Sequence, residues 1–182
     1  MIFNFFRKNK SNRAIVDRQY ETLTSTARIP FFYSDMDVPD TVMGRFEMLC
    51  LVMILFFRRT GKSGVSGQEL AQEIIDAFFQ DIDHSIRELG IGDQSVPKRM
   101  KKLAGMFYGR VQSYGDALGS ADLVALAEAL RRNIHPGEEA APAMLGLARW
   151  ALRTEGDLSA VTEDEIAHGT LMLPAPTNED LQ

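Results

Sequence analysis

The sequence contains few of the residues that form disulfides or catalytic sites. Its 182 residues include one cysteine, Cys50, and three histidines. A single cysteine cannot close an internal disulfide, so the fold does not depend on an oxidising compartment. The chain also lacks a phosphate-binding glycine loop, a nucleophile elbow and a paired-cysteine metal motif. Nothing in these patterns indicates a catalytic residue or a cofactor, and we expect neither.

The histidines lie in separate segments, and none suggests a metal site. Glu165 and His168 form an E-x-x-H, which is half of the di-iron motif of helical bundles, but the required second copy is missing. We therefore expect no bound metal. His135 precedes Pro136 in an expected loop, where a solvent-exposed side chain is predicted. Cys50 lies in the most apolar segment, where we expect a buried and unreactive thiol.

No hydrophobic run is long enough to cross a bilayer. The longest is Met48–Phe57, ten residues, whereas a membrane helix needs roughly twenty. Arg45 and Glu47 precede it, and Arg58 and Arg59 follow. A short helix that is apolar on all sides is typical of a bundle core. The sequence predicts a central core helix over residues 42–59.

The balance of charge excludes general attraction to nucleic acid. The chain has 25 acidic and 20 basic residues and a net charge of -5, whereas phosphate binding needs a positive excess. The charges are unevenly spread. Residues 1–28 hold six basic and two acidic side chains, and residues 155–182 hold seven acidic side chains and no lysine or arginine. A nucleic-acid partner is therefore not expected.

The N-terminal segment combines aromatic and basic side chains. Such a segment is predicted to touch an anionic membrane surface weakly, at about 1 kcal/mol per basic residue. The alternative is that it folds back onto the domain or is mobile. We expect a cytoplasmic protein, peripheral on the inner membrane through this segment. The predicted membrane-contact residues are Phe3, Phe5, Phe6, Arg7, Lys8 and Lys10.

Hydrophobic periodicity is helical nearly throughout the chain. Apolar residues recur at intervals of three and four, and no segment alternates like a strand. The predicted fold is all-α, a single-domain compact bundle of about six helices. We divide the chain into a basic aromatic tail (1–11), a helical domain (12–156) and an acidic, largely irregular tail (157–182). The expected helices cover residues 12–28, 42–59, 66–89, 97–118, 121–134 and 142–153.

A polar surface is predicted on the helices over 66–89 and 97–118. Asp83 and Arg87 pair at i,i+4 on the first. On the second, Lys98, Lys101 and Lys102 share a face with Gly105 and Gly109. Glycine lowers the stability of a helix interior by about 1 kcal/mol, and it commonly occurs there where another backbone approaches closely. Either a neighbouring helix of the same domain or an external helix is expected to occupy this face.

Four motifs in residues 79–118 occur together in one known family. They are D-x-D (Asp81, Asp83), R-E-x-G-x-G-D (Arg87–Asp93), K-R-M-K-K (Lys98–Lys102) and F-Y-G-R (Phe107–Arg110). This combination resembles the signature of the ubiquinol–cytochrome c chaperone family, with weaker similarity over residues 20–154. The chain is similar to the compact bacterial form, of alphaproteobacterial type.

The resemblance implies a non-enzymatic assembly chaperone for the cytochrome bc1 complex. Its expected partner is newly synthesised cytochrome b, and no cofactor is expected. Two alternatives remain: a helical adaptor or regulatory module that binds another protein, and an enzyme acting on a lipid or isoprenoid. The enzyme requires a deep pocket with several ionisable residues. The predicted partner-binding residues are Asp83, Arg87, Glu88, Asp93, Lys98, Lys101, Lys102, Gly105, Tyr108, Gly109 and Arg110.

Overall fold

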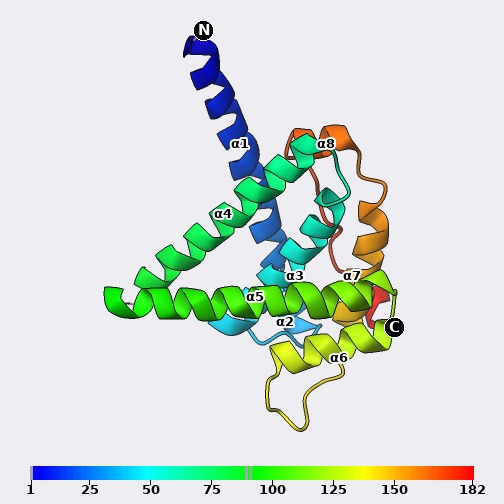
Figure 1. The fold of residues 1–182 in the computed structure, drawn as a ribbon. Coiled ribbons are helices and arrows are strands. Elements are labelled where there is room, and N and C mark those ends of the chain that lie inside the picture. Colours follow the sequence, from blue (N-terminus) through cyan, green and yellow to red (C-terminus); the bar gives the residue numbers. More distant parts are fainter. Residues whose placement is uncertain (1, 89, 91) are drawn as a thin grey trace.

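The computed structural model of the chain describes residues 2–88, 90 and 92–182, with side chains from residue 12 onward. Within these residues it is all-helical, as predicted (Figure 1). The long helices are α1 (Ile2–Ala27), α3 (Val42–Thr60), α4 (Val65–Glu88), α5 (Val96–Gly119), α6 (Leu123–Ile134) and α7 (Leu145–Leu158). The short ones are α2 (Phe31–Ser34), α8 (Glu163–Ala167) and the 3-10 turns η1 (Asp93–Ser95) and η2 (Asn178–Leu181).

Helix α3 forms the centre of the molecule. It begins after Thr41, whose side chain accepts a hydrogen bond from the Gly44 N–H at 3.1 Å, and it ends before Gly61. A hydroxyl at this position satisfies one of the free N–H groups of the first helical turn. Met48 and every residue from Cys50 to Phe56 are buried. The prediction of a central apolar helix with a buried Cys50 is confirmed.

Helices α4 and α5 form a V in front of α3. Figure 1 shows them meeting at the left of the molecule and diverging towards the right, with α3 behind the open part. Their junction contains buried side chains of Ile82, Ile86 and Val96. Beyond it, Phe78 and Phe107 touch with ring centroids 5.1 Å apart. This divergence determines the position of the candidate site.

Helix α1 begins ten residues earlier than predicted. The expected start was residue 12, but the helix begins at Ile2 and projects beyond the rest of the domain (Figure 1). No glycine or proline interrupts residues 2–27, so the backbone hydrogen bonds of the helix continue. The side chains of the six predicted membrane-contact residues, Phe3 to Lys10, lie outside the described part of the structure.

The connector between α1 and α3, residues 28–41, is partly helical. It contains α2, which inserts Phe32 into the core. The Phe32 ring packs edge-on against Trp150 of α7, with centroids 4.7 Å apart. Aromatic pairs in this geometry gain about 0.5–1.5 kcal/mol beyond area burial. This contact ties the connector to α7.

The acidic C-terminal segment packs across α1 and α7. It holds little regular structure besides α8 and η2, yet Leu171 and Leu173 are buried. The Gln19 amide donates to the Leu171 carbonyl at 2.9 Å and accepts from its N–H at 3.1 Å. Asp180 forms a 2.7 Å ion pair with Arg153 of α7. Contacts with α1 and α7, which are distant in sequence, hold this segment in place.

The prediction that His135 is solvent-exposed is wrong. His135 ends α6, and its side chain is buried. Its Nε2 lies 2.8 Å from the Asp37 carbonyl oxygen and its Nδ1 lies 3.1 Å from Glu138. The connector before α3 covers this side chain. Because Asp37 is 98 positions away in the sequence, the residues around His135 do not reveal the contact.

Candidate functional site

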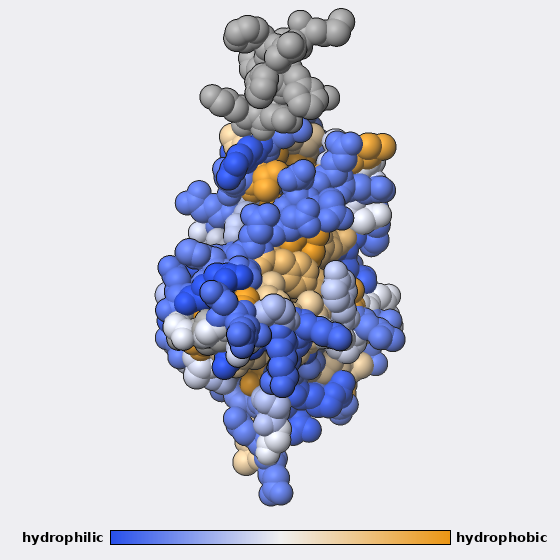
Figure 2. Space-filling model, turned by 60° about the vertical axis from the view of Figure 1, so that its left-hand side comes forward, coloured by the Kyte–Doolittle hydropathy of each residue, from blue (hydrophilic) through white to orange (hydrophobic). Residues whose placement is uncertain are grey.

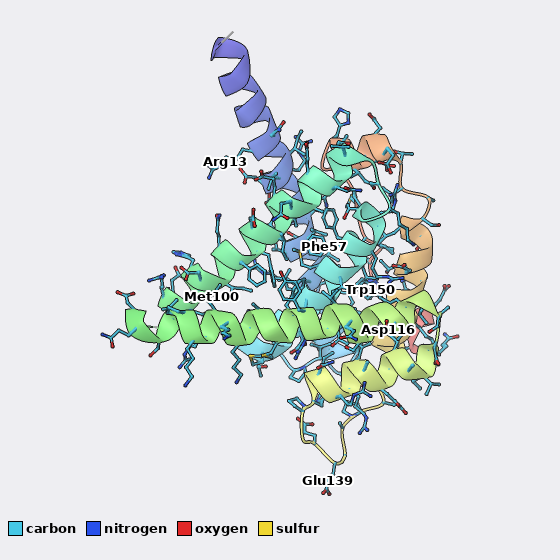
Figure 3. All side chains as sticks on the ribbon, viewed as in Figure 1. Arg13, Phe57, Met100, Asp116, Glu139 and Trp150 are labelled. Atoms are coloured by element: carbon cyan, nitrogen blue, oxygen red, sulfur yellow. The ribbon has the colours of Figure 1, made fainter. Side chains whose placement is uncertain are left out.

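An open apolar groove lies between α4 and α5, with α3 as its floor. Its volume is about 440 Å³. In Figure 3, Phe57 lies in the space between the two helices, and Met100 lies near their junction. Figure 2 shows a band of apolar side chains across the middle of the molecule, bordered by hydrophilic ones. The α4–α5 groove is lined by Ile54, Phe57, Arg58, Thr60, Gly61, Gln68, Ala71, Gln72, Ile75, Phe107, Tyr108, Val111 and Gly115.

The groove arises because two amphipathic helices diverge. Both walls carry apolar side chains that line the groove, among them Ile75 on α4 and Val111 on α5. Val111 is 39% exposed and Ile75 is only partly buried. Helical period identifies an apolar face, but not whether another element covers it. Sequence reasoning therefore missed these residues, together with Phe57.

The α4 wall changes from apolar to acidic towards the V junction. Beyond Ile75, the same side of α4 holds a second hollow lined by Asp76, Phe79, Gln80 and Asp83. Phe79 packs near Tyr108 of α5, with ring centroids 6.4 Å apart. The site thus combines an apolar trough with a charged end.

Arg87 binds two of the acidic residues predicted at the site. Its guanidinium lies 2.7 Å from Asp83 and 2.8 Å from Asp93. The Arg87 hydrogen bond holds the pKa of Asp83 below its usual value. Glu88 is exposed and lies 3.2 Å from His84. Arg87 thus neutralises the acids nearest to the N-terminal end of α5.

The lysine face of α5 is uncovered. We use this name for Lys98, Lys101, Lys102, Gly105 and Gly109, all of which are exposed. Among the described side chains, none forms an ion pair with these lysines. A methyl group added at either glycine meets nothing within 4 Å. No described helix of this domain packs on the face.

Tyr108 lies between the lysine face and the groove. It is 60% exposed and also lines the groove. Exposed tyrosines of this kind are frequent in binding surfaces, because the ring supplies apolar area and the hydroxyl a polar contact. Of the predicted partner-binding residues, Tyr108 is the one that the structure places in the groove itself.

Arg110 does not belong to this surface. Its side chain is 10% exposed and pairs with Glu47 of α3, which is 2% exposed. The guanidinium donates to the two Glu47 oxygens at 2.7 and 2.5 Å, and to the Met106 carbonyl at 2.9 Å. Including Arg110 among the exposed binding residues was an error, because the partner carboxylate lies on a helix distant in sequence. Sequence reasoning also missed Glu47.

The groove has little acid–base chemistry. The ionisable groups in its lining are Arg58 and Tyr108. Arg58 is occupied, since it pairs with Glu155 at 2.8 Å and donates to the Gly115 carbonyl at 3.0 Å. The described residues include no cluster of three metal-ligating side chains. Nor does any described helix have the length and apolarity needed to cross a bilayer. The arrangement can bind an apolar chain.

Comparisons with known proteins identify the family. The model of the ubiquinol–cytochrome c chaperone family matches residues 34–173. The chain belongs to this family. A solved structure, that of the Cbp3 homolog from Brucella abortus, is 48% identical and superposes with a TM-score of 0.86, covering 96% of this chain and 97% of that one.

A more distant relative is an assembly factor of an animal. Assembly factor 1 of the ubiquinol–cytochrome c reductase complex from Xenopus laevis is 24% identical over 103 residues, 57% of this chain. The match spans about half of that relative, 51% of its length. Ubiquinol–cytochrome c chaperones are assembly factors for respiratory complex III, and the predicted family is confirmed.

Proposed function

We propose that this protein binds newly synthesised cytochrome b and promotes its assembly into the bc1 complex, without catalysing a reaction. The observation that supports this proposal is the open α4–α5 groove. An assembly factor must hold apolar client segments that have not yet found their final partners. The groove offers apolar area on three helices and has a charged border at the V junction.

The lysine face supplies the second part of the proposed client surface. Exposed glycines at i and i+4 permit a helix of the client to approach closely. The lysines, which pair with no described side chain, complement acidic client loops, and such charges mainly accelerate and orient association. Tyr108 connects this face to the groove. One client helix and its adjoining loop would contact both parts.

The N-terminal end of α1 is the proposed membrane contact. Helix α1 projects from the domain, and its first residues combine aromatic and basic types. Clusters of this composition bind anionic lipid surfaces weakly and reversibly. A peripheral position at the inner membrane would hold the groove near the site where cytochrome b inserts.

Charge reversal on the lysine face tests the proposed client site. A triple change of Lys98, Lys101 and Lys102 to glutamate should leave the melting temperature nearly unchanged, since exposed substitutions usually cost under about 0.5 kcal/mol. Capture of tagged cytochrome b in co-purification, and the amount of assembled bc1 complex, should fall. Normal capture and assembly by this variant would contradict the assignment of the lysine face.

A matched control separates local from overall charge. Arg13, Arg28 and Arg132 are exposed, form no ion pair among the described residues, and do not belong to α5. Changing these three to glutamate alters the net charge equally. The control should capture cytochrome b like the parent. Failure of the unmodified protein to capture cytochrome b would contradict the proposed function itself.

A further inference from the structure

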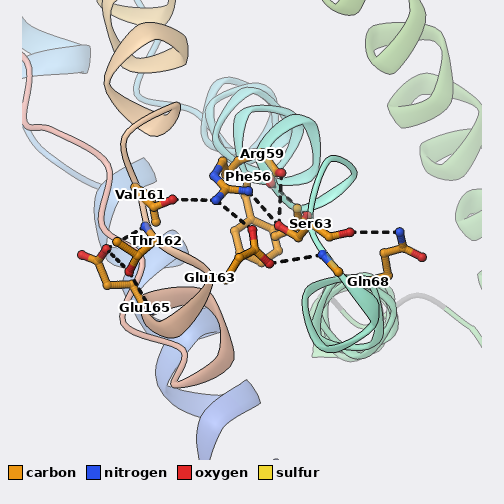
Figure 4. Close-up of polar contacts among 10 residues, drawn as sticks. Phe56, Arg59, Ser63, Gln68, Val161, Thr162, Glu163 and Glu165 are labelled. Carbon is orange, nitrogen blue, oxygen red and sulfur yellow. Dashed lines mark hydrogen bonds and ion pairs between the residues drawn. The ribbon is translucent and has the colours of Figure 1, made fainter.

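A network of hydrogen bonds connects α8 to one end of the α4–α5 groove. Figure 4 shows it around the turn between α3 and α4. The Arg59 guanidinium is 3.0 Å from one Glu163 oxygen, and the Gly64 N–H donates to the other at 3.2 Å. We call Arg59, Ser63, Gly64, Gln68 and Glu163 the turn network.

The turn network reaches the groove through Gln68. Arg59 donates to the Ser63 hydroxyl at 2.8 Å, and the Gln68 amide donates to the Ser63 carbonyl at 3.1 Å. Gln68 lines the groove together with Thr60 and Gly61 of the same turn. The end of the groove is thus formed by a loop whose shape depends on hydrogen bonds made behind it.

Glu163 is the member that joins the network to another element. Its carboxylate bridges the Arg59 side chain and the backbone of the turn, and no other described side chain accepts from the Gly64 N–H. The Arg59 and Gly64 hydrogen bonds hold the pKa of Glu163 below its usual value, so the bridge is charged at neutral pH. Arg59 also donates to the Val161 carbonyl, just before α8, at 2.5 Å.

We infer that Glu163 is a positioning residue that closes the end of the α4–α5 groove at Thr60, Gly61 and Gln68, and so limits how far an apolar client segment extends. The inference rests on the proposed function. Glu163 itself touches no groove-lining side chain through a hydrogen bond. It acts by holding in place the turn before α4, which forms this end of the groove.

A close neighbour provides a matched control. Glu165 lies in the same short helix, but its carboxylate accepts from the N–H and hydroxyl of Thr162, which caps α8. Glu165→Gln therefore perturbs α8 without touching the turn. Glu163→Gln makes the same change of charge and leaves one acceptor oxygen, so that Arg59 and Gly64 can no longer bind separate oxygens. Glu163→Asp keeps the charge on a side chain one methylene shorter.

Binding of the neutral apolar dye N-phenyl-1-naphthylamine to the full chain measures the groove directly. Val111→Asp, in the exposed part of the lining, should abolish dye binding and so locate it. Glu163→Gln should weaken the dye about two- to tenfold, since a side chain left mobile must be ordered on binding. Glu163→Asp should be intermediate, and Glu165→Gln should bind like the parent.

Three dye results would overturn the inference. They are unchanged affinity in Glu163→Gln, an equal loss in Glu165→Gln, and dye binding that survives Val111→Asp. Amide exchange at Gly64–Gln68 should rise in Glu163→Gln alone, with unchanged melting temperature. Cytochrome b capture should follow the dye affinities. Absence of capture by the parent protein would refute the proposed function, while the dye would still decide the role of Glu163.

Discussion

Replacing Arg110 with methionine leaves a buried carboxylate without its partner. Both oxygens of Glu47 accept hydrogen bonds from Arg110, at 2.7 and 2.5 Å. The Glu47 side chain is 2% exposed, so water cannot replace the guanidinium. Burial raises the pKa of Glu47 above its usual value, and Arg110 opposes part of that rise. Arg110→Met removes the opposing effect, and Glu47 should become protonated in the folded state.

The cost of that protonation follows from the pH. In the unfolded chain the Glu47 carboxyl has a pKa of about 4.3 and is ionised at pH 7. Taking up a proton when the variant folds therefore costs about 3.7 kcal/mol at this pH. This agrees with the roughly 3–5 kcal/mol usually lost when one partner of a buried pair is removed. For a chain of this size it corresponds to a melting temperature about 7–15 °C lower.

The sign of the pH dependence distinguishes this mechanism from a simple loss of packing. A carboxyl whose folded pKa is raised is most stabilising below its unfolded pKa, and that stability is lost as the pH rises. The penalty in Arg110→Met should therefore shrink to about 1 kcal/mol at pH 5. Urea denaturation followed by circular dichroism at both pH values measures it.

A double variant supplies the control. Glu47→Leu combined with Arg110→Met replaces the ion pair by apolar side chains, a change that is often neutral or stabilising. It should recover most of the lost stability and remove the pH dependence. A loss below about 1 kcal/mol at pH 7 in Arg110→Met, or a loss that does not shrink at pH 5, would refute the reasoning.

Three further changes test other parts of the fold. Asp180→Asn should lower the free energy of unfolding by about 1–3 kcal/mol in urea denaturation. Burial raises the pKa of Asp180, but the Arg153 and Thr177 hydrogen bonds outweigh this effect and lower the pKa overall. In the parent protein, the stability that the ionised Asp180 contributes is therefore lost as the pH falls. Burial raises the pKa of the Cys50 thiol, which should react with Ellman's reagent only when the protein unfolds. Cys50→Ser should lower the free energy of unfolding by about 1–3 kcal/mol without a selective loss of client capture. Rapid labelling of the folded protein would contradict the central position of Cys50. Deleting residues 1–10 should leave the melting temperature unchanged and abolish binding to anionic vesicles, and a melt several degrees lower would show that this segment belongs to the core.

Local patterns predicted the helices well because each depends on nearby residues. The capping pair Thr162 and Glu165 is a local pattern of this kind, and it is present as a reciprocal pair of hydrogen bonds. Helix α6 is capped by Asp122 and begins at Leu123, two residues after its predicted start at residue 121. Errors of this size arise because several polar residues at a helix junction are equally good caps.

The candidate site was predicted only in part. The exposure of Lys98 and Lys101 was predicted because they share a face opposite an apolar stripe, whereas Tyr108 was named through the F-Y-G-R motif. Arg110 was placed on the exposed surface, whereas it is buried against Glu47, a residue of α3 that is distant in sequence. Phe57 was placed in the core with the rest of the apolar run Met48–Phe57, because apolar groove walls and apolar cores have the same period.

The sequence by itself determined the all-α class, the central position of α3 and the family. Helical period, capping residues and a set of short motifs are local, and local signals survive without knowledge of the fold. Only the tertiary structure decided which apolar faces remain uncovered, where Arg110 and His135 find their partners, and how Glu163 reaches the turn before α4. Those contacts join residues about 60 to 100 positions apart, and such pairings depend on how the helices pack together.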